Sequence, residues 1–344
     1  MKSYDEKLKS KKYLLYFLLS VVYFIILIIV STRVPDFHND SIRYKYYFES
    51  YVVEGWIGRS DPLFNVVNYL VSRVSGSYEV AFAAYFVIQM LGHVSLVYAI
   101  TKRVNQADSY KLTFYLIVCL TSTWFYVSTV DGIRQGIALP YLYCFFMFFI
   151  DKKYIKATLF YLISVSFHSS SLLILPFILL TFINQKNIIY MLVLFSVGYV
   201  FGVNEMIVSM VSSLTGLPIY SMIKNYTEGT LKYYGFDVKF FIYTIFFAFI
   251  FYSSNRFIDE RYKGVFLDLC KVYAIFTIYY FIFGFAAFSN RYAFTPWNFI
   301  PLVLSYILVF SNVKINSYYR AFILFFIGCL GLYLFLNNFS MFWL

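Results

Sequence analysis

The chain has 344 residues, of which 61% are hydrophobic, 24% aromatic and only 13% charged. A soluble domain of this size could not bury that much apolar surface, so the sequence predicts a polytopic membrane protein. The net charge of +11 does not indicate a nucleic-acid partner, because membrane proteins gather lysine and arginine in their cytoplasmic loops.

About 11 apolar segments are predicted to cross the membrane as helices, which makes the expected fold an all-α bundle. In chain order they are 14–32, 78–100, 112–128, 137–150, 157–167, 171–183, 188–203, 238–254, 265–287, 292–310 and 321–340. Polar loops are expected at 33–61 and 204–237, and the short apolar segment 62–74 is expected at the membrane interface. No linker or repeat divides the chain, so one membrane domain is expected over 1–344.

Basic residues predict the orientation of these segments. A lysine-rich stretch from Lys2 to Lys12 precedes the first one, which places the N-terminus in the cytoplasm. The loops that follow as cytoplasmic are rich in lysine, whereas the outer segments favour arginine, which holds phosphate through paired donors. This arrangement requires 157–183 to form a hairpin with His168 near its outer turn. A single helix through 157–183 is the alternative, and it would invert everything downstream.

The first outer loop alternates carboxylates, arginines and tyrosines. Its candidate binding residues are Asp40, Arg43, Tyr44, Tyr47, Arg59 and Asp61. Aromatic faces can stack on sugar rings while polar groups bind hydroxyls. The alternative is a solvated loop with an interfacial belt of aromatic residues.

Arg134 and Gln135 lie between two glycines, just before the apolar segment 137–150. Backbone N–H groups are unpaired at a helix start and the helix dipole favours an anion there, so this stretch predicts a seat for phosphate. The alternative is that Arg134 only pairs with Asp131. Arg291 begins a later segment from the same predicted side, where it would supply a second phosphate contact or act as a snorkelling anchor.

The sequence contains no nucleotide-binding loop, no dinucleotide fingerprint and no zinc-ligand spacing. Its four cysteines all lie in apolar segments and offer neither a disulfide framework nor a metal site. No cofactor or metal is therefore expected, and an enzyme of this kind would use a substrate already in the membrane.

Three motifs in this order resemble the EpsG family of Wzy-type polysaccharide polymerases. They are Asp40–Tyr44 followed by Asp61–Phe64, then Ile133–Ala138, then Phe167–Ser170, with a late Asn290–Tyr292. The resemblance implies a GT-C-like glycosyltransferase on the outer face of a bacterial inner membrane. Such an enzyme joins repeat units carried on undecaprenyl pyrophosphate, and a chain-length regulator of the polysaccharide co-polymerase type is a possible partner. Related families often have Glu-Pro where this chain has Asp61-Pro62.

That chemistry assigns roles to the candidate residues. Negative charge builds on the departing pyrophosphate, and fixed cations stabilise it: Arg134 and Arg291 first, then Arg43 and Arg59. The acceptor hydroxyl needs a general base, for which His168, Asp40 and Asp61 all stay open. Tyr44 and Tyr47 are candidates for stacking on sugars.

Two other functions stay open at this point. A GT-C enzyme that adds one sugar from a polyprenyl-phosphate donor would use paired acidic residues, such as Asp36 and Asp40, in the first outer loop. A flippase or transporter of lipid-linked oligosaccharides would carry charges along a central cavity and show pseudo-symmetry between its halves.

Overall fold

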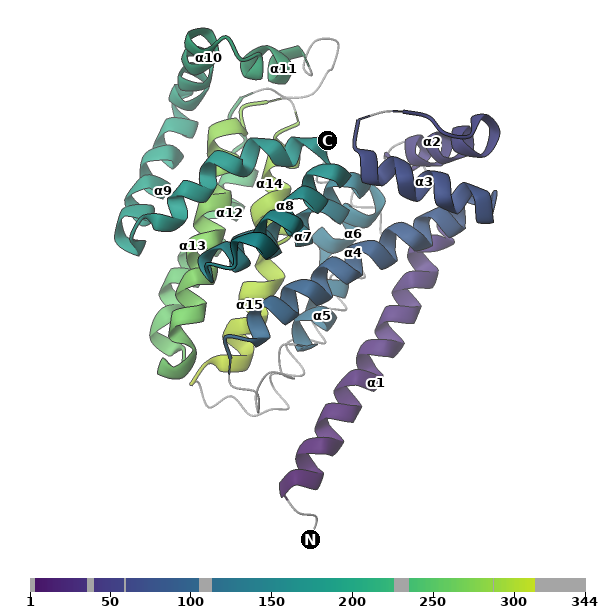
Figure 1. Cartoon of the computed structure of the whole chain (residues 1–344). Helices are drawn as coiled ribbons and strands as arrows, with labels where there is room; N and C mark the ends of the chain where they lie inside the picture. Colours follow the sequence, from purple (N-terminus) through teal and green to yellow (C-terminus); the bar gives the residue numbers. More distant parts are fainter. Residues whose placement is uncertain are drawn as a thin grey trace. The chain divides into compact units, whose positions relative to one another are not determined.

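The computed structural model describes residues 4–35, 40–58, 60–104, 113–225, 235–286 and 288–312. The long elements of this part are helices, as Figure 1 shows, and they confirm an all-α architecture. The chain divides into two compact units, residues 1–173 with 305–344 and residues 174–304.

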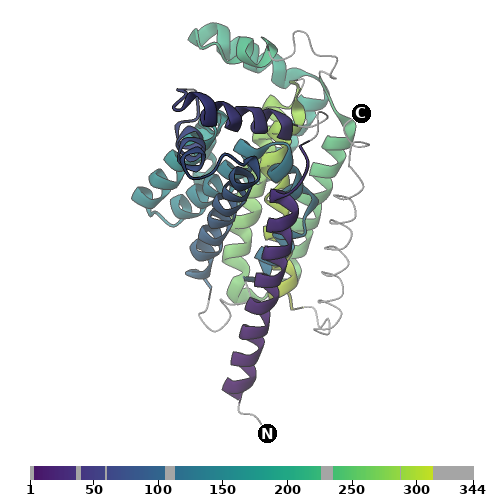
Figure 2. The same ribbon diagram turned by 90° about the vertical axis from the view of Figure 1, so that its right-hand side faces the viewer.

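The first unit is built from eight described helices, followed by the 3₁₀ helix η2. They are α1 (Tyr4–Ser31), α2 (Ser41–Glu54), α3 (Pro62–Val74), α4 (Tyr78–Thr101), α5 (Thr113–Leu120), α6 (Thr123–Val130), α7 (Ile133–Ile150), α8 (Tyr154–Phe167) and η2 (Ser169–Phe182). α7 packs between α4 and α8, and α1 lies along α4. The short helices α2 and α3 lie at the C-terminal end of α1, far from the N-terminus (Figure 2).

The second unit is arranged around α13, which packs against α9, α12 and α14. Its helices are α9 (Gln185–Val200), α10 (Val203–Thr215), α11 (Ile219–Asn225), α12 (Val238–Ser254), η3 (Asn255–Phe257), α13 (Glu260–Phe283) and α14 (Ser289–Trp297), with α15 (Ile300–Phe310) after them. The buried Asn204 amide donates to the carbonyl oxygens of Phe195 and Phe281, at 2.8 and 2.9 Å, and so ties α10 to α9 and α13. The predicted polar loops both contain helices: 33–61 contains α2, and 204–237 contains α11 and most of α10.

Six described helices are long and apolar enough to cross a membrane, so the chain is a multi-pass membrane protein. They are Lys12–Ser31, Tyr78–Thr101, Ile133–Ile150, Val238–Phe257, Glu260–Phe283 and Ser289–Phe310. The number rises to seven if α9 and α10, which meet at 94°, form one broken span. The prediction of about 11 spans is therefore wrong.

The number of predicted spans was too high because several apolar segments are broken into short helices. Segment 112–128 divides into α5 and α6, of 8 residues each, at Thr121 and Ser122. The Thr121 hydroxyl donates to the Ile117 carbonyl at 3.0 Å, the kind of local bond that competes with a continuous helix. α8 and η2 have 14 residues each, fewer than the roughly 20 that a crossing needs. The last predicted segment, 321–340, lies outside the described residues.

The break between α8 and η2 is a sharp turn at His168. The backbone of His168 is extended (φ −154°, ψ 104°), and the Ser164 hydroxyl donates to the Ser171 hydroxyl at 3.1 Å. Residues seven apart in one continuous helix are separated by roughly 10 Å along its axis. A single helix through 157–183 is therefore excluded, while the side of the membrane on which its ends lie stays a prediction.

Two glycines allow α7 to approach its neighbours closely. A Cβ on Gly92 of α4 would lie 2.7 Å from the Pro140 ring of α7. A Cβ on Gly136 would overlap the main-chain carbonyl oxygen of Ser128 in α6. Because that obstacle is backbone, a side-chain movement cannot relieve it, so Gly136 fixes the position of the first turn of α7 against α6.

Gly136→Ala should therefore destabilise the protein by about 1–3 kcal/mol, the usual cost of forcing an extra carbon into a packed site. Thermal unfolding of the purified protein in detergent measures the change. Gly264→Ala in α13 is the matched control, because a Cβ there meets no atom within 4 Å. Equal melting temperatures for the two variants would show that α6 and α7 can separate without cost.

Candidate active site around Asp61 and Arg134

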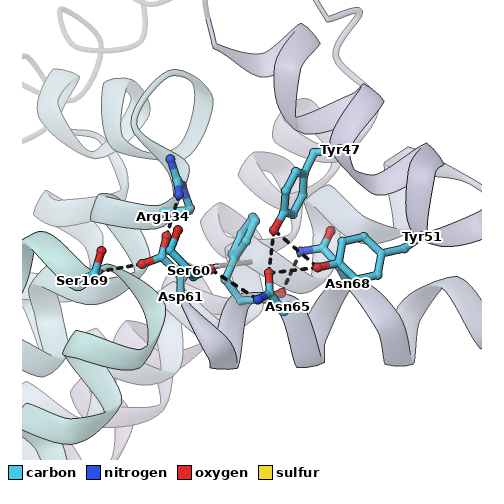
Figure 3. A network of polar contacts seen from close by, with 9 residues as sticks. Tyr47, Tyr51, Ser60, Asp61, Asn65, Asn68, Arg134 and Ser169 are labelled. Atoms are coloured by element: carbon cyan, nitrogen blue, oxygen red, sulfur yellow. Dashed lines mark hydrogen bonds and ion pairs between the residues drawn. The ribbon is translucent and has the colours of Figure 1, made fainter. Parts of the chain in front are cut away.

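Asp61 is the buried centre of a polar network in the first unit, drawn in Figure 3. Its side chain is 1% exposed, and Oδ2 forms an ion pair with Arg134 Nη1 at 2.5 Å. Oδ1 accepts a hydrogen bond from the backbone N–H of Ser169 at 2.7 Å. These partners lie 73 and 108 residues further along the chain, so one carboxylate brings together three separate predicted motifs.

The backbone at Asp61 is held in an unfavourable conformation. Its φ of 67° and ψ of 68° lie in the left-handed region, and Pro62 follows as the first residue of α3. This region costs most residues with a Cβ roughly 1–2 kcal/mol and aspartate less, and a following proline disfavours helical angles further. Strain of this kind persists only where the surroundings fix it, and it is concentrated at functional sites.

Arg134 is open on one side. It lies in the first turn of α7, its side chain is 37% exposed, and Asp61 engages only one of its two terminal nitrogens in the ion pair. Its guanidinium also faces the hydroxyl of Tyr44 from α2. Burial raises the pKa of Tyr44 and the nearby Arg134 charge opposes this, so at neutral pH the hydroxyl is uncharged and can donate.

The two candidate tyrosines occupy different positions from those predicted. Tyr44 is buried with its ring against Phe64, at 5.8 Å between centroids, so the ring face is not open to a sugar. The Tyr47 hydroxyl donates to Asn65 Oδ1 at 2.5 Å, and Tyr51 donates to the same atom at 2.9 Å. Tyr47 and Tyr51 therefore hold α2 against α3. The stacking roles of Tyr44 and Tyr47 stay predictions, and the burial of Tyr44 makes it the less accessible of the two.

Two asparagines complete this network and were missed in the sequence. The Asn65 amide donates to the Ser60 carbonyl at 3.2 Å, directly before Asp61. Asn68 accepts from the buried Tyr85 hydroxyl and donates to the Phe64 carbonyl. The sequence did carry a signal, because two asparagines three residues apart lie on one face of a mostly apolar helix, where a buried amide needs partners.

Asp40 and Asp131 form a second polar contact between the start of α2 and the end of α6. Asp131 Oδ1 accepts from the backbone N–H of Asp40 at 2.8 Å. Arg43, which is 79% exposed, pairs with Asp40 Oδ1 at 3.2 Å. Because Arg134 pairs with Asp61, the alternative in which Asp131 is its only partner is wrong.

The remaining candidates are placed as follows. His168 directly precedes Ser169, whose backbone N–H binds Asp61, and Gln135 follows Arg134 in α7. Arg291 belongs to the second unit, in the first turn of α14, where its guanidinium lies 4.7 Å from the centre of the Phe288 ring. Its predicted phosphate contact stays a prediction, and Arg59 lies outside the described residues.

Within the described ranges, no group of His, Cys, Asp and Glu side chains is arranged to hold a metal ion.

The arrangement can hold an anion beside a fixed cation. One face of Arg134 is accessible, while Asp61 fixes the other and is itself held by the hydrogen bond from the Ser169 N–H. Because both Asp61 oxygens are engaged and the side chain is buried, this carboxylate positions Arg134 and is poorly placed to accept a substrate proton.

Comparison with known proteins gives one match. A model of the EpsG family matches residues 16–344, which is nearly the whole chain. No curated protein and no solved structure matches.

Proposed function

The chain belongs to the EpsG family, which is linked to exopolysaccharide synthesis, and from this membership and its site we propose that it polymerises lipid-linked oligosaccharides. The reaction is glycosyl transfer at the outer face of a bacterial inner membrane. The growing chain leaves its undecaprenyl pyrophosphate and is joined to a hydroxyl of the next carrier-linked unit. The observation that carries the proposal is the meeting of Asp61, Arg134 and the His168–Ser169 turn at one buried carboxylate.

Arg134 is the proposed binding group for the pyrophosphate. The bond between the anomeric carbon and the pyrophosphate oxygen breaks, and its electron pair stays on that oxygen as negative charge. A guanidinium that is already held in place stabilises this charge without reorganising, which lowers the barrier. The exposed side of Arg134 is available for this contact, while Asp61 holds the opposite side.

His168 is the proposed general base. The acceptor hydroxyl oxygen forms the new bond to the anomeric carbon, and its proton must pass to a nearby group. Asp61 is buried with both oxygens engaged, and Asp40 pairs with Arg43 near the surface. Imidazole can accept a proton at neutral pH, and His168 directly precedes Ser169, whose backbone N–H binds Asp61.

Reconstitution tests the function directly. The purified protein in liposomes, given an undecaprenyl-pyrophosphate-linked repeat unit, should produce a ladder of glycans that differ by one repeat. A product with one added sugar would support the GT-C alternative, and movement of the lipid without any product would support a flippase. Either result would contradict the proposed polymerase.

The same assay tests the role of His168 as the general base. His168→Ala should lower the rate of polymerisation by about 10²–10⁴-fold, the usual contribution of a positioned base. Ser170→Ala, at the exposed position two residues further on, is the matched control and should leave the ladder unchanged. A normal rate for His168→Ala would remove His168 from the mechanism without affecting the role of Arg134.

A further inference from the structure

An open surface pocket of about 490 Å³, called the cavity below, lies in the second unit, where α12 ends and the chain passes through η3 to α13. It is lined by Phe249, Tyr252, Ser253, Asn255, Arg256 and Lys263. The lining is thus aromatic on the α12 side and basic where η3 and α13 contribute. This cavity takes no part in the reaction proposed above.

The charges around this cavity favour an anion. Arg256 is exposed, and its guanidinium lies 4.6 Å from the centre of the Phe257 ring. Lys263 pairs with Glu260 at 2.6 Å, but Glu260 is 80% exposed and is not part of the lining. The nearby Asp259 is paired with Arg261 at 2.7 Å. The lining itself therefore carries two cations and no carboxylate.

Asn255 offers a hydrogen-bond acceptor at the same place. Its side-chain Oδ1 is buried and accepts no hydrogen bond from the described part of the chain. A buried amide oxygen without a donor is unfavourable, so turning the Asn255 amide toward the cavity, where a bound group can donate to it, would be favoured. A ligand with both a phosphate and a hydroxyl would match this lining.

The cavity lies at the level where a membrane helix meets water. It is found at the end of the candidate span Val238–Phe257, next to the start of Glu260–Phe283. Arg256 at the end of the first span and Arg261 and Lys263 at the start of the second flank the short connection between them, which marks this connection as cytoplasmic under the positive-inside rule. Anionic lipid headgroups are concentrated on that side and attract such basic positions.

We propose that this cavity binds the headgroup of an anionic glycerophospholipid from the cytoplasmic leaflet. Arg256 and Lys263 hold its phosphate, and a headgroup hydroxyl donates to Asn255 Oδ1. The exposed ring of Phe249 lies against the acyl chains. Phosphatidylglycerol has all of these parts and is the probe to use.

Binding to the full-length protein in detergent tests the proposal. Phosphatidylglycerol should bind more tightly than phosphatidylcholine with the same acyl chains, as measured by native mass spectrometry. Arg256→Gln and Lys263→Gln should each weaken phosphatidylglycerol binding about fivefold, which corresponds to roughly 1 kcal/mol for one basic residue near an anionic lipid. The melting temperature without lipid shows that each variant is folded.

Arg261→Gln is the matched control, because it removes the same charge from the same connection but does not line the cavity. It should leave binding unchanged. An equal loss for Arg261→Gln would show a general charge effect and overturn the proposal, as would equal binding of phosphatidylcholine. Glycerol phosphate competing as strongly as the lipid would show a site for soluble phosphates instead.

Discussion

Replacing Arg134 with alanine should reduce polymer formation at least about 100-fold, even where the protein reaches its normal level in the membrane. Removal of one preorganised group that stabilises charge in a transition state typically costs 10²–10³-fold in rate. Arg134→Lys should recover only part of this loss, because an ammonium lacks the fixed, paired donors that match phosphate oxygens. The measurement is the length and amount of lipid-linked polymer at matched protein level.

A second effect of Arg134→Ala must be separated from this one. The variant leaves the buried Asp61 without its cation, and because Arg134 is 37% exposed the loss of stability should be below the roughly 3–5 kcal/mol of a fully buried pair. The Arg134→Ala/Asp61→Asn double variant removes both charges and should regain stability without regaining polymer. Full-length polymer from Arg134→Ala would disprove the role of the guanidinium, and polymer from the double variant would show that only stability had been lost.

Replacing Asp61 should also strongly reduce polymer formation, because Asp61 holds Arg134 in position. Asp61→Ala leaves Arg134 unpaired and the Ser169 N–H without its acceptor, so we expect both a lower melting temperature and little polymer. Asp61→Asn keeps the shape, and asparagine tolerates left-handed backbone better than most residues. It should therefore fold well and still polymerise at least tenfold more slowly, because Arg134 is no longer held by a charge.

The Asp61→Gly variant separates the effect of losing the carboxylate from the effect of the backbone strain at this position. Glycine removes the strain at φ 67° as well as the side chain, so it should be more stable than Asp61→Ala by up to about 1 kcal/mol. Its polymer yield should stay as low as that of Asp61→Ala. If Asp61→Gly formed normal polymer, the carboxylate would not position Arg134 during the reaction.

The sequence predicted the members of the site better than their contacts. Arg134 and His168 stand out locally, because a charged or titratable residue inside an apolar sequence is unusual. The Asp61–Arg134 pair could not be predicted, since 73 residues separate the partners and Asp131 was nearer along the chain. The burial of Tyr44 depends on how α2 packs on α3, which composition does not determine.

The number of spans was overestimated for a similar reason. Hydropathy identifies apolar segments but not where a helix breaks, and the breaks occur at hydroxyl-rich positions such as Thr121–Thr123 and His168–Ser171. There the side chains supply local hydrogen-bond partners that a continuous helix would not need. The all-α membrane architecture itself follows from composition, which is insensitive to these breaks.

The shortness of α8 has a consequence for how substrate reaches the site. α8 starts at a charged cluster in which Asp151 pairs with Arg103 at 3.1 Å and with Lys153 at 2.6 Å, as expected at a water boundary. From there its 14 residues rise about 21 Å, against roughly 30 Å of hydrocarbon. For a helix along the membrane normal, the turn at His168, and with it Asp61 and Arg134, would lie about 9 Å below the far surface of the bilayer. The diphosphate of the carrier proposed above would then have to reach Arg134 below the bilayer surface, where fewer water molecules compete for the guanidinium.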